Sequence, residues 1–305
     1  MRRRVASLLP STTEIVAALG GLDQLVGRSH ECDFPPEVTE LPVISRPRRE
    51  PVGPSAAIHR DVQQLLTEVL SIYQVDVDAL TAAAPDLILT QDLCRVCAVA
   101  EDEVVAAAKA HLGHTVEVLT SSPLTLDAVL DDVHRVAVAL GDAPAGVALV
   151  AALRGELDTI HAAVADRPRP TLVLLEWVDP LMAGGTWGPE LIETAGATPL
   201  LGVRGGHSPI LTFDELRAAD PDILVLSPCG YDLERAGADV PLLTGQPGWA
   251  ELRAARSGRV AVIDGSAYVN RPGPRLVETT AILAAIAHGV GPGRALEGAG
   301  WRWVD

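Results

Sequence analysis

The sequence predicts an α/β protein made of two similar lobes with mainly parallel sheets, joined by one long rigid helix. Short apolar runs alternate with helical patterns along most of the chain, which is typical of parallel α/β folds. One segment recurs after a shift of 136 residues. A single apolar stripe at helical spacing lies between the two copies. The length of 305 residues is sufficient for about two domains.

The N-terminal α/β lobe is expected over residues 1–122. Its first element is an apolar strand ended by Pro10, and a helix capped by Thr12 or Thr13 follows and ends at a Gly-Gly pair. A Pro-rich stretch over 42–54 predicts a loop in which Arg46, Arg48 and Arg49 are solvated. Strands are expected at 5–9, 25–27, 86–90 and 116–119, and helices at 77–84 and 101–112.

A helical segment is expected over 123–168, broken near Gly141. Its second half has the stripe Leu149, Leu153, Leu157, Ile160 and Val164, which predicts the long helix between the lobes. The C-terminal lobe and tail then cover 169–305. Strands are expected there at 172–175, 223–226 and 260–263, and helices at 189–195, 214–219 and 276–288.

The internal repeat supports two lobes of similar topology. Its identical pairs share a Pro-Asp dipeptide that precedes an apolar triplet in both copies, a pattern that is hard to obtain by chance from Ala-rich helices. The shift lays Asp78, Leu80, Ala82, Ala83, Pro85 and Asp86 over Asp214, Leu216, Ala218, Ala219, Pro221 and Asp222.

Composition excludes several classes of function. The formal net charge of −16 repels a phosphate backbone or an anionic membrane surface, so we expect no nucleic-acid partner. No apolar run approaches the roughly 20 residues of a membrane-spanning helix. The basic start lacks the apolar run of a secretory signal, and four cysteines are too few for a disulfide framework. We therefore expect a cytoplasmic monomer, or a periplasmic or extracellular protein if the true N-terminus lies upstream.

Unusual residues gather in the loops that follow the strands. Ligands of parallel α/β sheets bind beyond the carboxyl ends of the strands. The loops after the expected strands, at 10–13, 29–36, 91–97, 176–187, 227–232 and 265–274, contain all four cysteines and half of the ten Trp, Tyr and Phe residues. This concentration predicts a binding cleft between the lobes. Its five aromatic residues are Phe34, Trp177, Trp187, Tyr231 and Tyr268.

The pair Cys94 and Cys97 has three interpretations. A Cys-x-x-Cys after a strand is typical of thioredoxin-like redox sites, but this chain is far too long for that fold. With His30, Cys32 or Cys229, the pair has the ligand types of a zinc or iron–sulfur site, although a second Cys-x-x-Cys is absent. The favoured interpretation is that the cysteines line a pocket or pack beneath a loop.

The polar residues of these loops also allow more than one role. His30 and His207 are the two histidines expected in loops near the cleft, whereas the other six fall on helices or helix ends. Carboxylates in the same loops can form an acid–base pair, but no accompanying catalytic motif is present, so hydrogen bonding to a ligand is favoured. The carboxylates are Glu31, Asp33, Asp92, Glu176 and Asp179.

Two arginines near the last expected helix also have two possible roles. Arg271 and Arg275 flank a rigid Pro-Gly-Pro turn, and they either contact a ligand or fix the loop.

Four motifs resemble the cobalamin-binding branch of the class III ABC-importer substrate-binding proteins, and the resemblance covers about residues 5–289. The first is shared with siderophore, haem and metal binders of the same superfamily, whereas the second and third are narrower. They are Ser7-Leu8-Leu9-Pro10-Ser11-Thr12-Thr13-Glu14-Ile15, Gly27-Arg28-Ser29-His30-Glu31-Cys32-Asp33-Phe34-Pro35, Gln91-Asp92-Leu93-Cys94-Arg95-Val96-Cys97-Ala98-Val99 and Asn270-Arg271-Pro272-Gly273-Pro274-Arg275.

The resemblance implies non-catalytic binding of cobalamin or a related corrinoid between two lobes. In importer-linked relatives an acidic residue on each lobe docks on permease arginines, and Asp78 and Asp214 are the candidate counterparts here. The alternative is that each is a carboxylate at a helix N-terminus, where the helix dipole favours it. A corrin is a broad, partly apolar disc edged with amides, so rings and hydrogen-bonding groups are expected around it. His30 or a cysteine is a candidate axial ligand of cobalt.

The alternatives to corrinoid binding are a haem, siderophore or metal-ion binder of the same fold, and a corrinoid- or tetrapyrrole-acting enzyme that uses Glu176 or a cleft cysteine. The expected ligand contacts are Ser11, Thr12, His30, Glu31, Cys32, Phe34, Gln91, Asp92, Cys94, Cys97, Glu176, Trp177, Trp187, His207, Tyr231, Tyr268 and Arg271.

Overall fold

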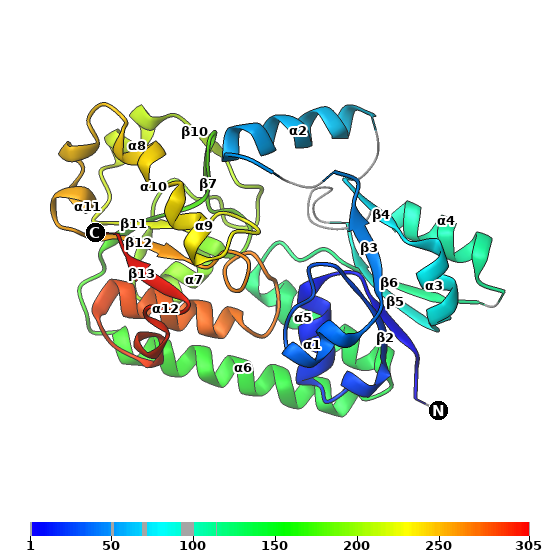
Figure 1. Ribbon diagram of the computed structural model, residues 1–305. Coiled ribbons are helices and arrows are strands. Elements are labelled where there is room, and N and C mark those ends of the chain that lie inside the picture. Colours follow the sequence, from blue (N-terminus) through cyan, green and yellow to red (C-terminus); the bar gives the residue numbers. More distant parts are fainter. Residues whose placement is uncertain (1, 50–51, 69–71, 93–100, 114, 305) are drawn as a thin grey trace. The chain divides into compact units, whose positions relative to one another are not determined.

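The computed structural model describes residues 2–49, 52–68, 72–92, 101–113 and 115–304. The chain divides into two compact units. Unit 1 consists of Met1–Gly53, Arg60–Pro123 and Asp127–Ala152, and unit 2 consists of Pro54–His59, Leu124–Leu126 and Leu153–Asp305. Each unit contains one sheet with helices packed on it (Figure 1). No helix in the described ranges is long and apolar enough to cross a membrane.

Unit 1 is built on a six-stranded sheet in the order β4-β3-β2-β1-β5-β6. All neighbouring strands are parallel except β4, which pairs antiparallel with β3. The strands are β1 (Val5–Ser7), β2 (Leu25–Ser29), β3 (Val43–Pro47), β4 (Tyr73–Val75), β5 (Leu87–Gln91) and β6 (Glu117–Ser121). The helices that begin before residue 143 are α1 (Pro10–Ala18), η1 (Leu22–Gln24), η2 (Pro36–Glu40), α2 (Ser55–Glu68), α3 (Val77–Ala83), α4 (Glu101–His111) and α5 (Leu126–Leu140).

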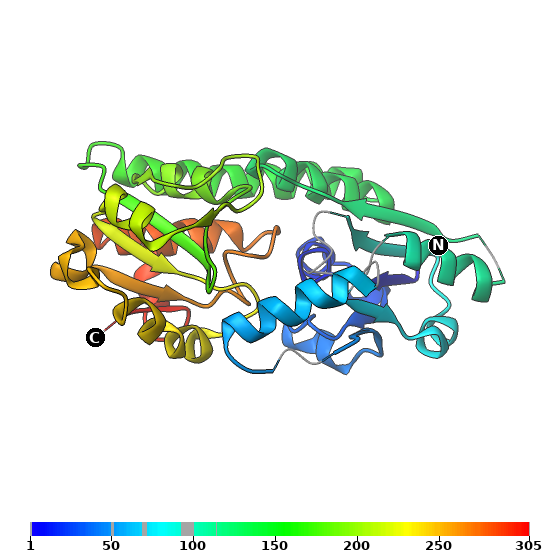
Figure 2. The same cartoon turned by 90° about the horizontal axis from the view of Figure 1, so that it is seen from above.

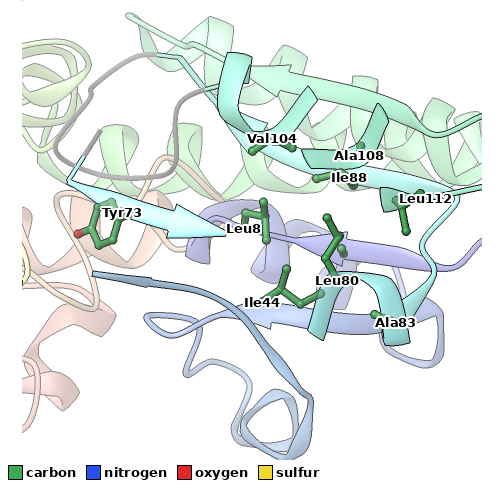
Figure 3. Close-up of a cluster of buried hydrophobic side chains, with 10 residues drawn as sticks. Leu8, Ile44, Tyr73, Leu80, Ala83, Ile88, Val104, Ala108 and Leu112 are labelled. Atoms are coloured by element: carbon green, nitrogen blue, oxygen red, sulfur yellow. The ribbon is translucent and has the colours of Figure 1, made fainter. Parts of the chain in front are cut away.

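The core on one face of this sheet lies beneath α3 and α4. Leu8, Ile44 and Ile88 contribute from three strands or their ends, and Leu80 and Val104 contribute from the two helices. Each of these five side chains is at most 1% exposed, so their burial stabilises the packing of the two helices on the sheet. Figure 3 shows Tyr73 at one end of this cluster, with its hydroxyl directed away from the aliphatic side chains.

Unit 2 is built on a seven-stranded mixed sheet in the order β10-β8-β7-β11-β12-β13, with β9 also paired to β7. Its central strands β7, β11 and β12 are parallel. The strands are β7 (Thr171–Val178), β8 (Leu181–Ala183), β9 (Thr198–Pro199), β10 (Ile210–Leu211), β11 (Ile223–Leu226), β12 (Val260–Ile263) and β13 (Trp301–Trp303). The helices are α7 (Gly188–Thr194), α8 (Phe213–Ala219), α9 (Leu233–Ala238), α10 (Val240–Thr244), η3 (Trp249–Glu251), α11 (Arg253–Arg256), α12 (Leu276–His288) and η4 (Pro292–Leu296).

A single unbroken helix, α6 (Ala143–Val164), begins in unit 1 and ends in unit 2. Both views show it as one continuous rod (Figures 1 and 2). Leu153, Leu157, Ile160 and Val164 of the expected stripe are buried. The long helix expected from this stripe is therefore confirmed.

The internal repeat is present in the structure. Shifted by 136 residues, α3 matches the bounds of α8, and β5 begins where β11 begins. Asp76 and Thr212 cap the two helices at equivalent positions, and both helices end at a left-handed residue, Ala84 with φ 40° and Asp220 with φ 39°.

The aspartate after each repeated proline also has the same task. Asp86 accepts the N–H of Arg4, which directly precedes β1, at 3.1 Å. Asp222 accepts the N–H of Thr171, the first residue of β7, at 2.8 Å. Asp86 directly precedes β5 and holds the start of β1, the strand that pairs with β5. Asp222 directly precedes β11 and holds the start of β7, the strand that pairs with β11.

The structure differs in detail from three expectations about local structure, and a fourth cannot be compared. The stretch 42–54 is not all loop, because its residues 43–47 form β3, and Arg46 and Arg48 make ion pairs with Asp76 and Glu103 at 3.1 and 2.8 Å. The first helix begins at Pro10, since proline fits the first helical position. The strand expected at 172–175 continues to 178 because it pairs with β8. The expectation for residues 94 and 97 lies outside the described residues.

Candidate functional site

Chemically active side chains meet at the carboxyl edge of the sheet of unit 1. His30 and Glu31 follow β2, and Tyr73 begins the antiparallel strand β4, so all three lie at the same edge. The Tyr73 hydroxyl donates to Glu31 Oε1 at 2.9 Å. The ring centroids of His30 and Tyr73 are 5.2 Å apart. His30 Nε2 lies 3.8 Å from Glu31 Oε1.

The orientation of His30 is fixed by the neighbouring strand β3. Its backbone N–H donates to the carbonyl of Ser45 at 3.2 Å, and Nδ1 lies 3.1 Å from the same oxygen. Because a carbonyl only accepts, we assign the ring proton to Nδ1. The lone pair of the neutral ring is then on Nε2, the nitrogen on the side of Glu31.

Two expected contacts in unit 1 lie in the core and not at its edge. Thr12 Oγ1 and Thr13 Oγ1 each lie 2.8 Å from Ser7 Oγ, and the Thr13 hydroxyl lies 3.1 Å from the sulfur of Cys32. Thr12 and Cys32 are both 1% exposed. We conclude that they pack and hydrogen-bond within the unit.

Ser11 differs from this network. It is 1% exposed and occupies the first turn of α1, and its Oγ has no hydrogen-bond partner among the described residues. An unpaired buried hydroxyl costs about 1–3 kcal/mol. Gln91 is buried at the end of β5, whereas Asp92 and Phe34 are exposed, Phe34 by 42%.

In unit 2, a partly buried carboxylate lies near the end of β7. Glu176 accepts the hydroxyl of Ser208 and the N–H of Gly185, the latter at 3.3 Å. Burial raises its pKa, and these two hydrogen bonds partly oppose the rise. A side chain at Gly185 would meet backbone atoms of Gly206, His207 and Ser208 within 2.8 Å, so this loop depends on glycine.

Aromatic side chains of unit 2 form a second group. Trp177 contacts Tyr231 edge-on, with ring centroids 5.2 Å apart, and the guanidinium of Arg235 lies 4.0 Å above the Tyr231 ring. Tyr231 is 3% exposed. Ser55 Oγ lies 3.4 Å from its hydroxyl and donates to Asp239. Tyr231 is thus enclosed by the protein, while Trp177 is only partly buried.

The other expected contacts of unit 2 differ in exposure. Trp187 is 6% exposed and donates its indole N–H to the carbonyl of Val269 at 2.9 Å. Tyr268 is partly buried, and the guanidinium of Arg275 lies 5.6 Å from its ring centre. Arg271 is 8% exposed, and His207 is exposed.

Three polar residues of the two edges were missed in the sequence. Tyr73 and Ser208 bond the candidate carboxylates, and Ser227 follows β11 with a fully buried Oγ that has no partner among the described residues. The repeat contained a signal for Ser227, because the shift of 136 residues places it over Gln91. The scarcity of tyrosine, three in the chain, was a signal for Tyr73.

Metal ligands and acidic docking residues were also expected from the sequence. In the described part of the chain, no group of three or more His, Cys, Asp or Glu side chains is arranged to hold a metal ion. Asp78 and Asp214 are exposed in the first turns of α3 and α8, and Asp214 pairs with Arg217 at 3.0 Å.

A model of the periplasmic binding protein family matches residues 5–267. No curated protein matches the chain. A periplasmic haem-binding protein from Pseudomonas aeruginosa is 25% identical, with a TM-score of 0.69 over 95% of this chain and 94% of that one. The haem-binding protein RhuT from Roseiflexus sp. RS-1 is 21% identical, with a TM-score of 0.70 over 95% and 99%. The vitamin B12 binding protein BtuF of Vibrio cholerae is 18% identical, with a TM-score of 0.65 over 94% and 96%.

These similarities extend over nearly the whole chain and agree with the two units, their mixed sheets and the helix α6. The expected two-lobe α/β fold is confirmed. The chain belongs to the periplasmic binding protein family, the non-catalytic substrate-binding proteins of ABC importers.

Proposed function

We propose that this protein binds cobalamin or a related corrinoid through residues at the carboxyl edges of its sheets. The observation that carries the proposal is that Ser11 Oγ and Ser227 Oγ, one at each edge, are buried and have no protein partner among the described residues. A third buried hydroxyl without a partner in the described part of the chain, Thr120 Oγ1, lies within β6. Side-chain amides around a corrin donate and accept hydrogen bonds, so they can pair both serine hydroxyls and remove the cost of leaving them unpaired. Trp177 and Tyr268 supply partly buried rings for the apolar disc.

Charge favours a neutral, amide-edged ligand over one with free carboxylates. The edge of unit 1 carries Glu31 and Asp92, and the whole chain has a formal net charge of −16. In unit 2, Arg271 interacts electrostatically with the partly buried Asp264. The pKa of Asp264 is raised, first by burial, and Arg271 partly opposes this rise. A dianionic porphyrin therefore meets repulsion at one edge and a partly neutralised cation at the other.

Haem is the second candidate because of His30 and Tyr73. An imidazole with its lone pair on Nε2 and a neighbouring phenol are both axial ligands of haem iron. The haem-binding proteins among the similar structures agree with this candidate. On either candidate, His30 is the residue that we propose to approach the metal of the ligand.

Parallel titrations separate the two candidates. Apo protein is titrated with hydroxocobalamin and with haemin while the visible spectrum and tryptophan fluorescence are followed. We expect saturable binding of hydroxocobalamin that is weakened about tenfold in S11A and S227A, each of which removes about one hydrogen bond. S257A, which removes an exposed hydroxyl bonded to its own helix, is the matched control. Binding of haemin alone would overturn the corrinoid proposal.

A spectral test addresses His30. If His30 approaches the metal, H30A changes the spectrum of the bound ligand and weakens binding. An unchanged spectrum and affinity in H30A would exclude axial ligation by this residue.

We also propose that Asp78 and Asp214 dock on an ABC permease. The repeat puts them at equivalent positions, and both are exposed. We expect D78R combined with D214R to abolish ligand uptake in cells that depend on this protein while leaving ligand affinity in solution unchanged. D158R, at an exposed position on α6, is the matched control. Full uptake with both charges reversed would refute the docking role.

A further inference from the structure

Arg28 is not one of the proposed ligand contacts, but its guanidinium donates several hydrogen bonds to backbone carbonyls near His30. Its Nη1 donates to the carbonyls of Ser29, His30 and Cys32 at 3.1, 3.3 and 3.1 Å. Its Nη2 donates to the carbonyl of Thr39 at 3.1 Å. One guanidinium therefore holds four carbonyls at and beyond the end of β2, and three of these belong to residues 29–32.

The residues held in this way include the part of the unit 1 edge that carries His30 and Glu31. His30 is fixed on its other side by the carbonyl of Ser45, and Glu31 is fixed by the hydroxyl of Tyr73. The backbone N–H of Arg28 itself bonds to the carbonyl of Pro42 at 2.9 Å, so the base of its side chain is anchored to the neighbouring segment. The guanidinium thus links the loop to a fixed point in the sheet.

Only arginine can make this arrangement. Its planar group carries five N–H donors at fixed angles, whereas lysine concentrates three donors on one nitrogen and is more strongly hydrated. The carbonyls of residues 29 and 39 are reached through different nitrogens of the guanidinium, which a single ammonium cannot reproduce.

We infer that Arg28 is a positioning residue for ligand binding, which acts by holding the 29–32 backbone so that His30 presents Nε2 at the edge of unit 1. The inference rests on the proposed function for its effect on affinity, but its effect on His30 is a property of the protein without ligand. Groups that orient a metal-binding histidine from behind typically change affinity about 10- to 100-fold when removed.

The chain contains a matched control in Arg4. Its Nε and Nη2 donate to the carbonyls of Ala83 and Ala84 at 2.6–3.2 Å, so it also binds a cluster of carbonyls in unit 1. Arg4 precedes β1 and therefore lies at the opposite end of the sheet. R28K and R4K lose the same kind of bond, but only R28K loses it beside His30.

Two measurements test the inference on the full-length protein. Nitrogen NMR of apo protein reports the tautomer of His30, with H30A used to assign its signals. We expect the Nδ1–H form in wild type and R4K, and a mixture of tautomers in R28K. Titration with hydroxocobalamin is expected to give affinity about 10- to 100-fold lower in R28K and unchanged in R4K.

The outcomes separate this inference from the proposed function. If wild type binds no hydroxocobalamin, the proposed function fails, and the NMR signals of His30 still test Arg28. If R28K does not fold, R28Q, which keeps two N–H donors, takes its place in both measurements. Wild-type His30 signals and affinity in a folded Arg28 variant would overturn the inference, and so would loss of folding in both variants.

Discussion

Gly27 allows a stability prediction that can be worked from distances. This residue lies in β2, next to Arg28, and is the first residue of the motif that ends at Pro35. A Cβ at Gly27 would lie 2.0 Å from Cδ1 and 2.7 Å from Cγ1 of Ile44. Ile44 is fully buried, so neither side chain can move into solvent. The glycine is required by packing and not by its backbone angle, since its φ is not in the left-handed region.

We expect G27A to lower the free energy of unfolding by about 1–3 kcal/mol, the usual cost of overpacking a core. I44V removes the Cδ1 atom that makes the 2.0 Å contact and by itself costs about 0.5–1.5 kcal/mol. In the double variant the methyl group added at position 27 occupies part of the space that Cδ1 leaves. The double variant is therefore expected to be more stable than the sum of the two single changes predicts, by about 1 kcal/mol.

Urea unfolding followed by far-UV circular dichroism measures these differences, with the slope m compared among all variants. G155A is the matched control, because Gly155 lies in α6 and a Cβ there meets no atom within 4 Å. A helical glycine-to-alanine change is expected to stabilise by about 0.5–1 kcal/mol. A G27A variant as stable as wild type, or additive effects in the double variant, would refute the packing argument.

Three further predictions concern polar groups of the two units. Because the pKa of Glu176 is raised in the folded protein, its contribution to stability is present below the unfolded pKa of about 4.5 and is lost as pH rises through the folded pKa. We expect the melting temperature of E176Q, measured between pH 4 and 8, to lack this decrease with pH. The same pH dependence of the melting temperature in E176Q and wild type would contradict the prediction. The pKa of Asp222 is lowered, first by the hydrogen bond from the N–H of Thr171, so stability depends on pH in the opposite direction. The contribution of Asp222 to stability is present above its unfolded pKa of 3.8 and is lost as pH falls through the folded pKa. In urea unfolding we expect D222N to be less stable than wild type by about 1.5 kcal/mol at pH 7 and equally stable in strong acid. S55A removes the donor to the buried Asp239 carboxylate and is expected to cost about 1–3 kcal/mol, whereas S257A is not; equal melting temperatures for the two would refute this role of Ser55.

The parts of the fold that could be predicted are those in which one local signal dominates. The strands 223–226 and 260–263 and the helix 276–288 have the expected bounds, because each is a short apolar run or a helix ended by glycine. β3 was missed because prolines lie at its ends and two of its residues are polar. Ser45 is nevertheless buried, and Arg46 is paired with Asp76, and these are contacts that a local pattern does not contain.

The candidate site was predictable as an edge, but its individual contacts were less so. The rule that ligands bind at the carboxyl ends of strands brought together His30, Glu31 and Gln91. The rule did not distinguish these residues from Thr12 and Cys32, whose side chains are buried in a network of hydroxyl and thiol groups. The direction of a side chain depends on strand register and on neighbours distant in the sequence, such as Ser45 and Tyr73 beside His30.

The paired aspartates of the repeat have a consequence for how this protein can change. Asp86 and Asp222 each secure the alignment of two central strands from the amino end of a sheet, using hydrogen bonds to backbone. Alignment is thereby controlled at the end remote from the loops that differ between the halves. Changes in those loops are therefore expected to leave the alignment of the paired strands intact.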